Sequence, residues 1–142
     1  MGAMSRRRAQ PAALSPTAPC PCGLPAGYAD CCGPLHGGRA AAATAEQLMR
    51  SRFTAFAVHD EAYLLRTWHP DTRPPRVDFA PGLRWDRLEV LAATDGGPFH
   101  SEGTVTFRAH YTEGGRAGAM SEHSTFLRHQ GAWVYHRALD SD

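Results

Sequence analysis

The chain has 142 residues and a formal net charge of +1 at pH 7, and all of its basic side chains are arginines. This length suits one domain with a small appendage. The near-neutral charge provides no global field for holding nucleic acid, and no apolar run approaches the roughly 20 residues that span a bilayer. We therefore expect no membrane binding, and weak nucleic-acid binding through the arginine-rich tail and the cysteine segment is kept only as a third possibility.

Residues 1–18 are rich in Ala, Pro and Arg and show no periodicity, which predicts a disordered tail. Three consecutive arginines, residues 6–8, are similar to the basic start of a secretory signal. Such a signal needs an apolar stretch behind the charge, and here prolines and polar residues interrupt it. We therefore expect a soluble, cytoplasmic protein.

All four cysteines lie in residues 19–38, as Cys20, Cys22, Cys31 and Cys32. Disulfides suit small secreted domains, and adjacent cysteines rarely bond to each other without backbone strain. A thioredoxin-like redox pair needs the spacing Cys-x-x-Cys at a helix start, which is missing. Four thiolates form a closed tetrahedral shell for a structural Zn²⁺ ion, which is our leading interpretation. His36 is close enough in sequence to replace one cysteine, although a histidine in the loop or behind the ligands is the simpler interpretation.

From Thr44 onward the pattern is helical. Thr44 and Gln47 fit a capping box, and Met49, Phe53 and Phe56 recur at helical spacing. A second, shorter helix is predicted after a cap at Asp60. It includes Tyr63, Leu64, Leu65 and Trp68, and Pro70 ends it.

After residue 82, apolar and polar residues alternate in four segments, 83–93, 103–111, 119–129 and 132–139, separated by glycine-containing turns. Helices followed by antiparallel strands predict an α+β domain over residues 42–140. The apolar face of the sheet must be covered, so we expect the helices to pack across it. A strongly curved sheet would leave a cavity beneath them.

The segment CPCGLPAGYADCCG resembles the SEC-C zinc motif, which is best known at the C-terminus of the protein translocase motor ATPase. The resemblance puts the four cysteines on the ligand positions, Tyr28 on an aromatic position and Gly33 on the glycine that follows. It also implies an interaction with a protein partner, ribosomal or chaperone-like. Residues 24–26, Leu-Pro-Ala, stand where the motif usually has the basic residues that make those contacts.

The segments LMRSRFTAF, YLLRTWHP and GTVTFRAHY resemble the bacterial YchJ-like family, and the resemblance covers residues 19–138. In that family a SEC-C motif precedes a domain like nuclear transport factor two, a cone of curved antiparallel sheet and helices. The resemblance therefore implies a small N-terminal zinc knuckle followed by a cone-shaped domain. Because this fold hosts enzymes, binding proteins and assembly modules, it implies little about activity. Exposed sheet edges in this class often pair, so a homodimer is one expectation.

Three residues are candidates for a site in the cone, namely His69, Asp71 and Arg52. His69 is a general base oriented by Asp71, or it caps the last carbonyls of the second helix. Arg52 reaches inward, either to a carboxylate such as Glu89 or Glu122 in a buried ion pair, or to an anionic ligand.

Three strand histidines, His110, His123 and His136, converge only if the strand register places them on one face, and solvated strand faces explain them equally well. The aromatic residues are predicted to form core rather than a pocket, namely Phe53, Phe56, Tyr63, Trp68, Trp85, Trp133 and Tyr135.

No complete catalytic set is recognisable in the sequence. The leading functional hypothesis is a zinc-binding adaptor that recruits a protein partner. The alternative is an enzyme or small-molecule binder that uses a pocket in the cone. The second hypothesis requires an open cavity in the cone, whereas the first does not.

Overall fold

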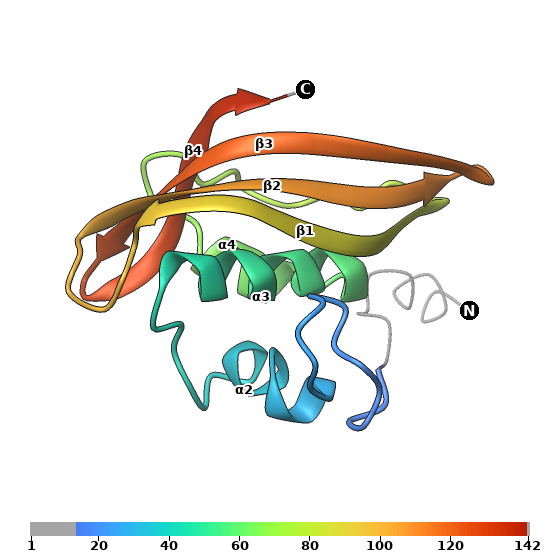
Figure 1. The fold of residues 1–142 in the computed structure, drawn as a ribbon, viewed down its shortest axis with the longest axis horizontal. Coiled ribbons are helices and arrows are strands. Elements are labelled where there is room, and N and C mark those ends of the chain that lie inside the picture. The colour runs from blue at the N-terminus through green and yellow to red at the C-terminus, as the bar shows by residue number, and fades with distance from the viewer. Residues whose placement is uncertain (1–13, 142) are drawn as a thin grey trace.

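The computed structural model describes residues 14–141, in which a curved antiparallel sheet lies over one long helix and the cysteine segment lies on the other side of that helix (Figure 1). The predicted tail falls largely on residues 1–13, outside the described residues. Within the rest of it, the carbonyls of Pro16 and Ala18 accept hydrogen bonds from the backbone N–H groups of Ala29 and Tyr28.

The long helix, α3 (Ala45–Val58), begins where the capping pattern predicts. The hydroxyl of Thr44 accepts a hydrogen bond from the backbone N–H of Gln47 at 3.0 Å, and the Gln47 side chain accepts one from the backbone N–H of Ala43 at 2.7 Å. These contacts satisfy N–H groups that have no partner inside the helix. They fix the start of the helix that carries most of the candidate site.

The second helix, α4 (Glu61–Arg66), is capped by Asp60 as predicted, with its carboxylate accepting from Tyr63 N–H at 3.1 Å. The prediction that Trp68 belongs to this helix is wrong. The backbone N–H of Tyr135 donates to the Thr67 carbonyl, and the N–H of His69 donates to the Tyr135 carbonyl, each at 2.8 Å. Pairing with a distant strand therefore draws the chain out of the helix.

The sheet contains β1 (Leu83–Asp95), β2 (Glu102–Glu113), β3 (Arg116–His129) and β4 (Ala132–Ser141), paired antiparallel in chain order. All four predicted strands are present, and the α+β class is confirmed. The pairing of β1 with β2 and of β3 with β4 contains register shifts. Such bulges bend strands, which fits the curvature seen in Figure 1.

Two apolar clusters hold these layers together. The larger one lies between α3 and the sheet and includes Leu48, Phe53, Phe126 and Trp133. The smaller one joins Leu35, in the short helix α2 (Gly33–His36), to residues of α3 and α4. The cysteine segment is therefore packed on α3. Among the described residues, no helix has the length and apolar character needed to cross a membrane.

Candidate functional site

The four cysteines come together as the sequence predicts, with their sulfur atoms all within 4.8 Å of one another. The sulfurs of Cys22 and Cys31 are 3.5 Å apart, and all four thiols are free. A tetrahedral ion with metal–sulfur bonds of about 2.3 Å separates its sulfurs by about 3.8 Å. The donor set and its spacing therefore fit a metal ion with four thiolate ligands.

Glycines shape this cluster at two places. Gly23 follows Cys22 with φ +93°, a conformation that side chains disfavour. At Gly33 a Cβ atom would lie 2.8 Å from the carbonyl oxygen of Tyr28, so a side chain would push the second pair of cysteines away. Between the pairs, the short 3-10 helix η2 (Tyr28–Asp30) reverses the chain.

Three of the four thiols have shifted pKa values, and the shifts differ in direction. Hydrogen bonds from the thiols of Cys22 and Cys32 place the pKa of Cys20 far below its usual value. Burial raises the pKa of Cys31 to about 12, and the hydrogen bond to Cys20 raises the pKa of Cys32. Without metal, one thiolate is thus stabilised by thiols around it, and a metal ion must displace the remaining protons.

Residues of α3 surround the cluster. The hydroxyl of Thr54 lies 3.8 Å from the sulfur of Cys20, and Arg50 Nη1 donates to the carbonyl oxygen of Cys22 at 2.8 Å. Arg50 also pairs with Glu46 at 3.0 Å. A divalent ion with four thiolates carries a net charge of about −2, which a neighbouring guanidinium and hydroxyl stabilise.

His36 is not part of the cluster. Its Nδ1 lies 2.7 Å from the hydroxyl of Tyr28, and its Nε2 donates to the Ser51 carbonyl oxygen at 2.8 Å. Because the carbonyl can only accept, Nε2 carries the ring proton and Nδ1 accepts from Tyr28. Both ring nitrogens are occupied, so His36 links the cysteine segment to α3 instead of replacing a cysteine.

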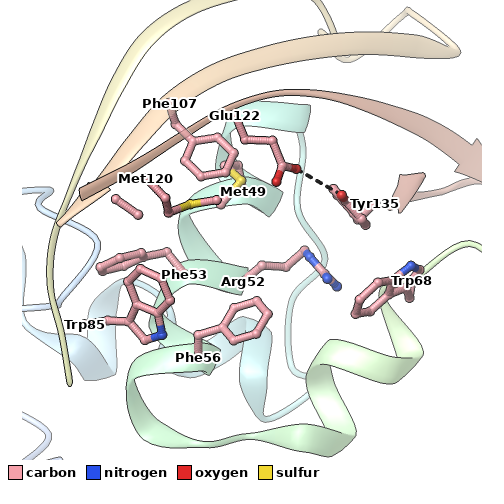
Figure 2. Close-up of a pocket in the computed structure, with 11 residues that line it drawn as sticks. Met49, Arg52, Phe53, Phe56, Trp68, Trp85, Phe107, Met120, Glu122 and Tyr135 are labelled. Atoms are coloured by element: carbon pink, nitrogen blue, oxygen red, sulfur yellow. Dashed lines mark hydrogen bonds between the residues drawn. The ribbon is translucent and has the colours of Figure 1, made fainter. Parts of the chain in front are cut away.

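A cavity of about 230 Å³ lies between α3 and the concave face of the sheet (Figure 2). Five aromatic residues that were predicted as core line it, namely Phe53, Phe56, Trp68, Trp85 and Tyr135. Phe53 is at the same time buried in the core, as predicted, and Phe56, Trp85 and Tyr135 pack against the core clusters. Tyr63 and Trp133 do lie in the core. The other lining residues are Met49, Arg52, Phe107, Ala109, Met120 and Glu122.

Arg52 is 3% exposed and reaches from α3 toward Trp68 and Tyr135 (Figure 2). Its guanidinium carbon lies 4.9 Å from the centre of each of these two rings. Its Nη1 donates to the Leu64 carbonyl at 2.9 Å and to the Thr67 hydroxyl at 2.8 Å. Burial lowers the pKa of Arg52 to about 10, which leaves it charged at neutral pH.

The predicted ion pair of Arg52 is wrong. Among the described residues, no carboxylate lies within 4.0 Å of its nitrogens. Glu89 instead binds His110, with Nε2 and Oε1 2.6 Å apart, and Glu122 accepts hydrogen bonds from Ser124 and Tyr135. The faces of two aromatic rings stabilise the cation where a carboxylate was expected.

His69 and Asp71 lie outside the cavity, so the structure does not bring them together with Arg52. His69 does not cap the second helix either, because Thr67 and Arg52 bind its last carbonyls. The strand histidines do not converge as a trio, since His110 pairs with Glu89 while His136 packs on His69. No sequence pattern pointed to His129, whose ring also contacts that of His69.

Comparisons with known proteins agree with this architecture. Residues 44–138 match the model of the YchJ middle domain, which is like nuclear transport factor two, and residues 17–34 match the SEC-C motif. A UPF0225 protein of Streptomyces coelicolor is 59% identical over 120 residues, covering 84% of this chain and 94% of that protein. A UPF0225 protein of Corynebacterium glutamicum is 52% identical over 116 residues, covering 82% of this chain and 92% of that protein.

Two solved structures are also similar. The solution structure of a SEC-C motif containing protein from Rhodopseudomonas palustris has 34% identity and a TM-score of 0.76, covering 87% of this chain and 98% of that one. The crystal structure of a SEC-C motif containing protein from Psychrobacter arcticus has 29% identity and a TM-score of 0.67, covering 87% of this chain and 80% of that one.

Proposed function

The chain belongs to the family of bacterial proteins that join a SEC-C motif to the YchJ middle domain. We propose that it binds a small organic anion in the cone cavity and one structural zinc ion in the cysteine cluster. The observation that carries the first part is the buried guanidinium of Arg52, which borders an open cavity and has no carboxylate partner within the part of the chain that the structure describes. This favours the small-molecule hypothesis for the cone over the adaptor hypothesis.

The chemistry of the cavity indicates the kind of ligand. Within the described residues, the hydrogen bonds of the Arg52 guanidinium all leave from Nη1, so its Nε–H and Nη2–H groups remain for a ligand. A guanidinium binds carboxylate or phosphate oxygens through paired hydrogen bonds, and a buried one gains most from such a partner. The aromatic wall suits a flat apolar body, and a cavity of about 230 Å³ limits its size.

Zinc is the metal that we propose for the cysteine cluster because it favours four tetrahedral thiolates and needs no redox chemistry. Cys20, Cys22, Cys31 and Cys32 would hold it, and no ligand position would remain for a substrate. When bound, the ion supplies positive charge that stabilises four thiolates in one place. Since zinc-binding thiols must stay reduced, the proposal includes a cytoplasmic location.

The cavity proposal is tested by titrating the protein with 4-phenylbutyrate and with its neutral amide while following tryptophan fluorescence. Trp68 and Trp85 both line the cavity and report on its occupancy. We expect the acid to bind at least about tenfold more tightly, because hydrogen bonds to a charged group contribute about 1.5–3 kcal/mol. The Ala109→Leu variant, which fills the cavity and leaves Arg52 in place, should abolish binding. Equal binding of acid and amide would contradict the proposal.

The adaptor hypothesis is a second candidate, supported by Leu24, which is 40% exposed between the two cysteine pairs. This apolar side chain lies on the loop that the metal would stabilise, where a protein partner can reach it. The resemblance to the SEC-C motif makes ribosomes and chaperones the partners to test first. Cosedimentation with ribosomes that is lost in Leu24→Asp, at unchanged zinc content, would support this candidate.

A further inference from the structure

A second group of metal-ligating side chains lies outside both the cysteine cluster and the cavity. It joins His69 and Asp71, from the segment after α4, to His136 on β4, and one ligand atom of each lies within 4.8 Å of the other two. The ring of His129 at the end of β3 is also close, with its centre 5.2 Å from that of His69. Neither proposed function uses these residues.

The backbone holds this group in place. His69 N–H donates to the Tyr135 carbonyl at 2.8 Å, which sets His69 beside the strand position next to His136. The hydroxyl of Thr72 donates to the carbonyl of His136 at 2.6 Å, which fixes the other end of the same segment. Two bonds between the segment and β4 therefore bring the histidines together, independently of any side-chain attraction.

The ring of His69 faces Asp71, the second proposed ligand. Its Nδ1 accepts a hydrogen bond from the backbone N–H of Asp71 at 3.0 Å and lies 3.7 Å from the Asp71 carboxylate. The Nδ1 lone pair therefore faces Asp71, while the proton of the neutral ring is on Nε2. An ion between Nδ1 and the carboxylate would bind this lone pair in place of the backbone N–H of Asp71. The His69 side chain is only 14% exposed, whereas Asp71 is 77% exposed and free to adjust.

We propose that His69, Asp71 and His136 form a second metal site, which binds a divalent first-row transition ion such as Zn²⁺ at the edge of the sheet. Imidazole nitrogens with one carboxylate suit zinc, iron, nickel or copper more than magnesium or calcium. Three protein ligands leave at least one coordination position open, unlike the closed cysteine cluster. An ion here could therefore bind an outside ligand.

The charges around the site are compatible with a cation. The carboxylate of Asp71 supplies negative charge within 4.8 Å of the ligand nitrogens of both histidines. This charge offsets the repulsion between Arg137 and an incoming ion.

The test follows histidine ring nitrogens by NMR while Zn²⁺ is added to the full chain, without a histidine tag, after a first equivalent has been supplied. We expect the ring signals of His69 and His136 to shift saturably with one further ion per chain, while those of His110 and His123 stay unchanged. Because the readout comes from the rings, it does not depend on which metal the cysteines hold. Absence of a shift at His69 and His136 up to millimolar zinc would overturn the proposal.

Two variants test the ligand set. His136→Gln and Asp71→Asn should each weaken zinc binding at this site by at least about tenfold, since even groups behind the ligands commonly contribute that much. Asp71 is so exposed that its substitution leaves the fold intact. His123→Gln is the matched control and should bind like the wild type. Unchanged affinity in Asp71→Asn and His136→Gln would show that the three residues do not act as ligands.

Discussion

The Nε2–H of His36 donates a hydrogen bond to the Ser51 carbonyl oxygen at 2.8 Å, and so ties the cysteine segment to the middle of α3. Ser51 is followed directly by Arg52, whose side chain lines the cavity on the other face of the helix. Arg50, just before it, donates to Cys22. One turn of α3 therefore contacts both the cysteine cluster and the cavity, and this contact underlies the first two predictions.

Replacing His36 by Ala should destabilise the protein without removing its metal. The substitution removes two hydrogen bonds, one to the Ser51 carbonyl and one from the Tyr28 hydroxyl, which contribute about 0.5–1.5 kcal/mol each. Urea unfolding and metal analysis of the same sample measure both quantities, with His123→Ala as the control. Loss of zinc in His36→Ala would instead identify His36 as a ligand.

Removing the zinc should loosen the cavity as well as the cysteine segment. Four thiols without metal no longer hold the segment against α3, and the contacts through Arg50, His36 and Thr54 weaken. A loss of about 2 kcal/mol would lower the Tm by roughly 6 °C or more. Calorimetry with and without chelator measures the Tm, and 4-phenylbutyrate binding should weaken in parallel. An unchanged Tm would argue that the segment and α3 are uncoupled.

Zinc binding should release protons and strengthen as the pH rises. Cys31, with a pKa of about 12, and Cys32, with a raised pKa, are protonated at neutral pH, whereas hydrogen bonds from Cys22 and Cys32 lower the pKa of Cys20. We therefore expect at least two and fewer than four protons per ion, and a zinc affinity that falls in acid. Calorimetric titrations in two buffers of different ionisation enthalpy count the protons. Release of none would contradict the cluster described above.

Trp68 should tolerate Phe but not Ala. Its indole Nε1 is buried without a hydrogen-bond partner in the described residues, so Phe loses no bond and keeps an aromatic face for Arg52. Replacement by Ala removes the ring and should lower the free energy of unfolding by about 3 kcal/mol. This is the lower end of the range for buried tryptophans, because Trp68 is only half-buried. Equilibrium unfolding of the two variants gives the difference. Equal destabilisation by both would mean that the aromatic face does not stabilise Arg52.

Local patterns predicted a large part of this structure. The side chains of Thr44 and Asp60 accept hydrogen bonds from backbone N–H groups three residues away. A short stretch of sequence is therefore enough to predict where each helix begins. The alternation of apolar and polar residues likewise predicted β1 to β4. Successive side chains of a strand point to opposite faces, so burial of one face makes every second residue apolar. The clustering of four cysteines followed from their number and spacing, together with the resemblance to the SEC-C motif.

The features that escaped prediction depend on residues far apart in sequence. Trp68 leaves the helix because the flanking Thr67 and His69 bond to Tyr135, a residue on the last strand. The same pairing supplies Trp68 and Tyr135, the two rings that stabilise Arg52. Whether the cone is hollow depends on sheet curvature, which arises from bulges that no local pattern predicts.

The most direct test of the account is native mass spectrometry of the untagged, freshly purified protein after brief treatment with a mild chelator that strips weak sites. The account predicts one zinc ion per chain, retained in the wild type and lost in Cys22→Ser, together with thiols that resist alkylation until the metal is removed. A chain that carries no metal and has four freely reactive thiols would contradict it.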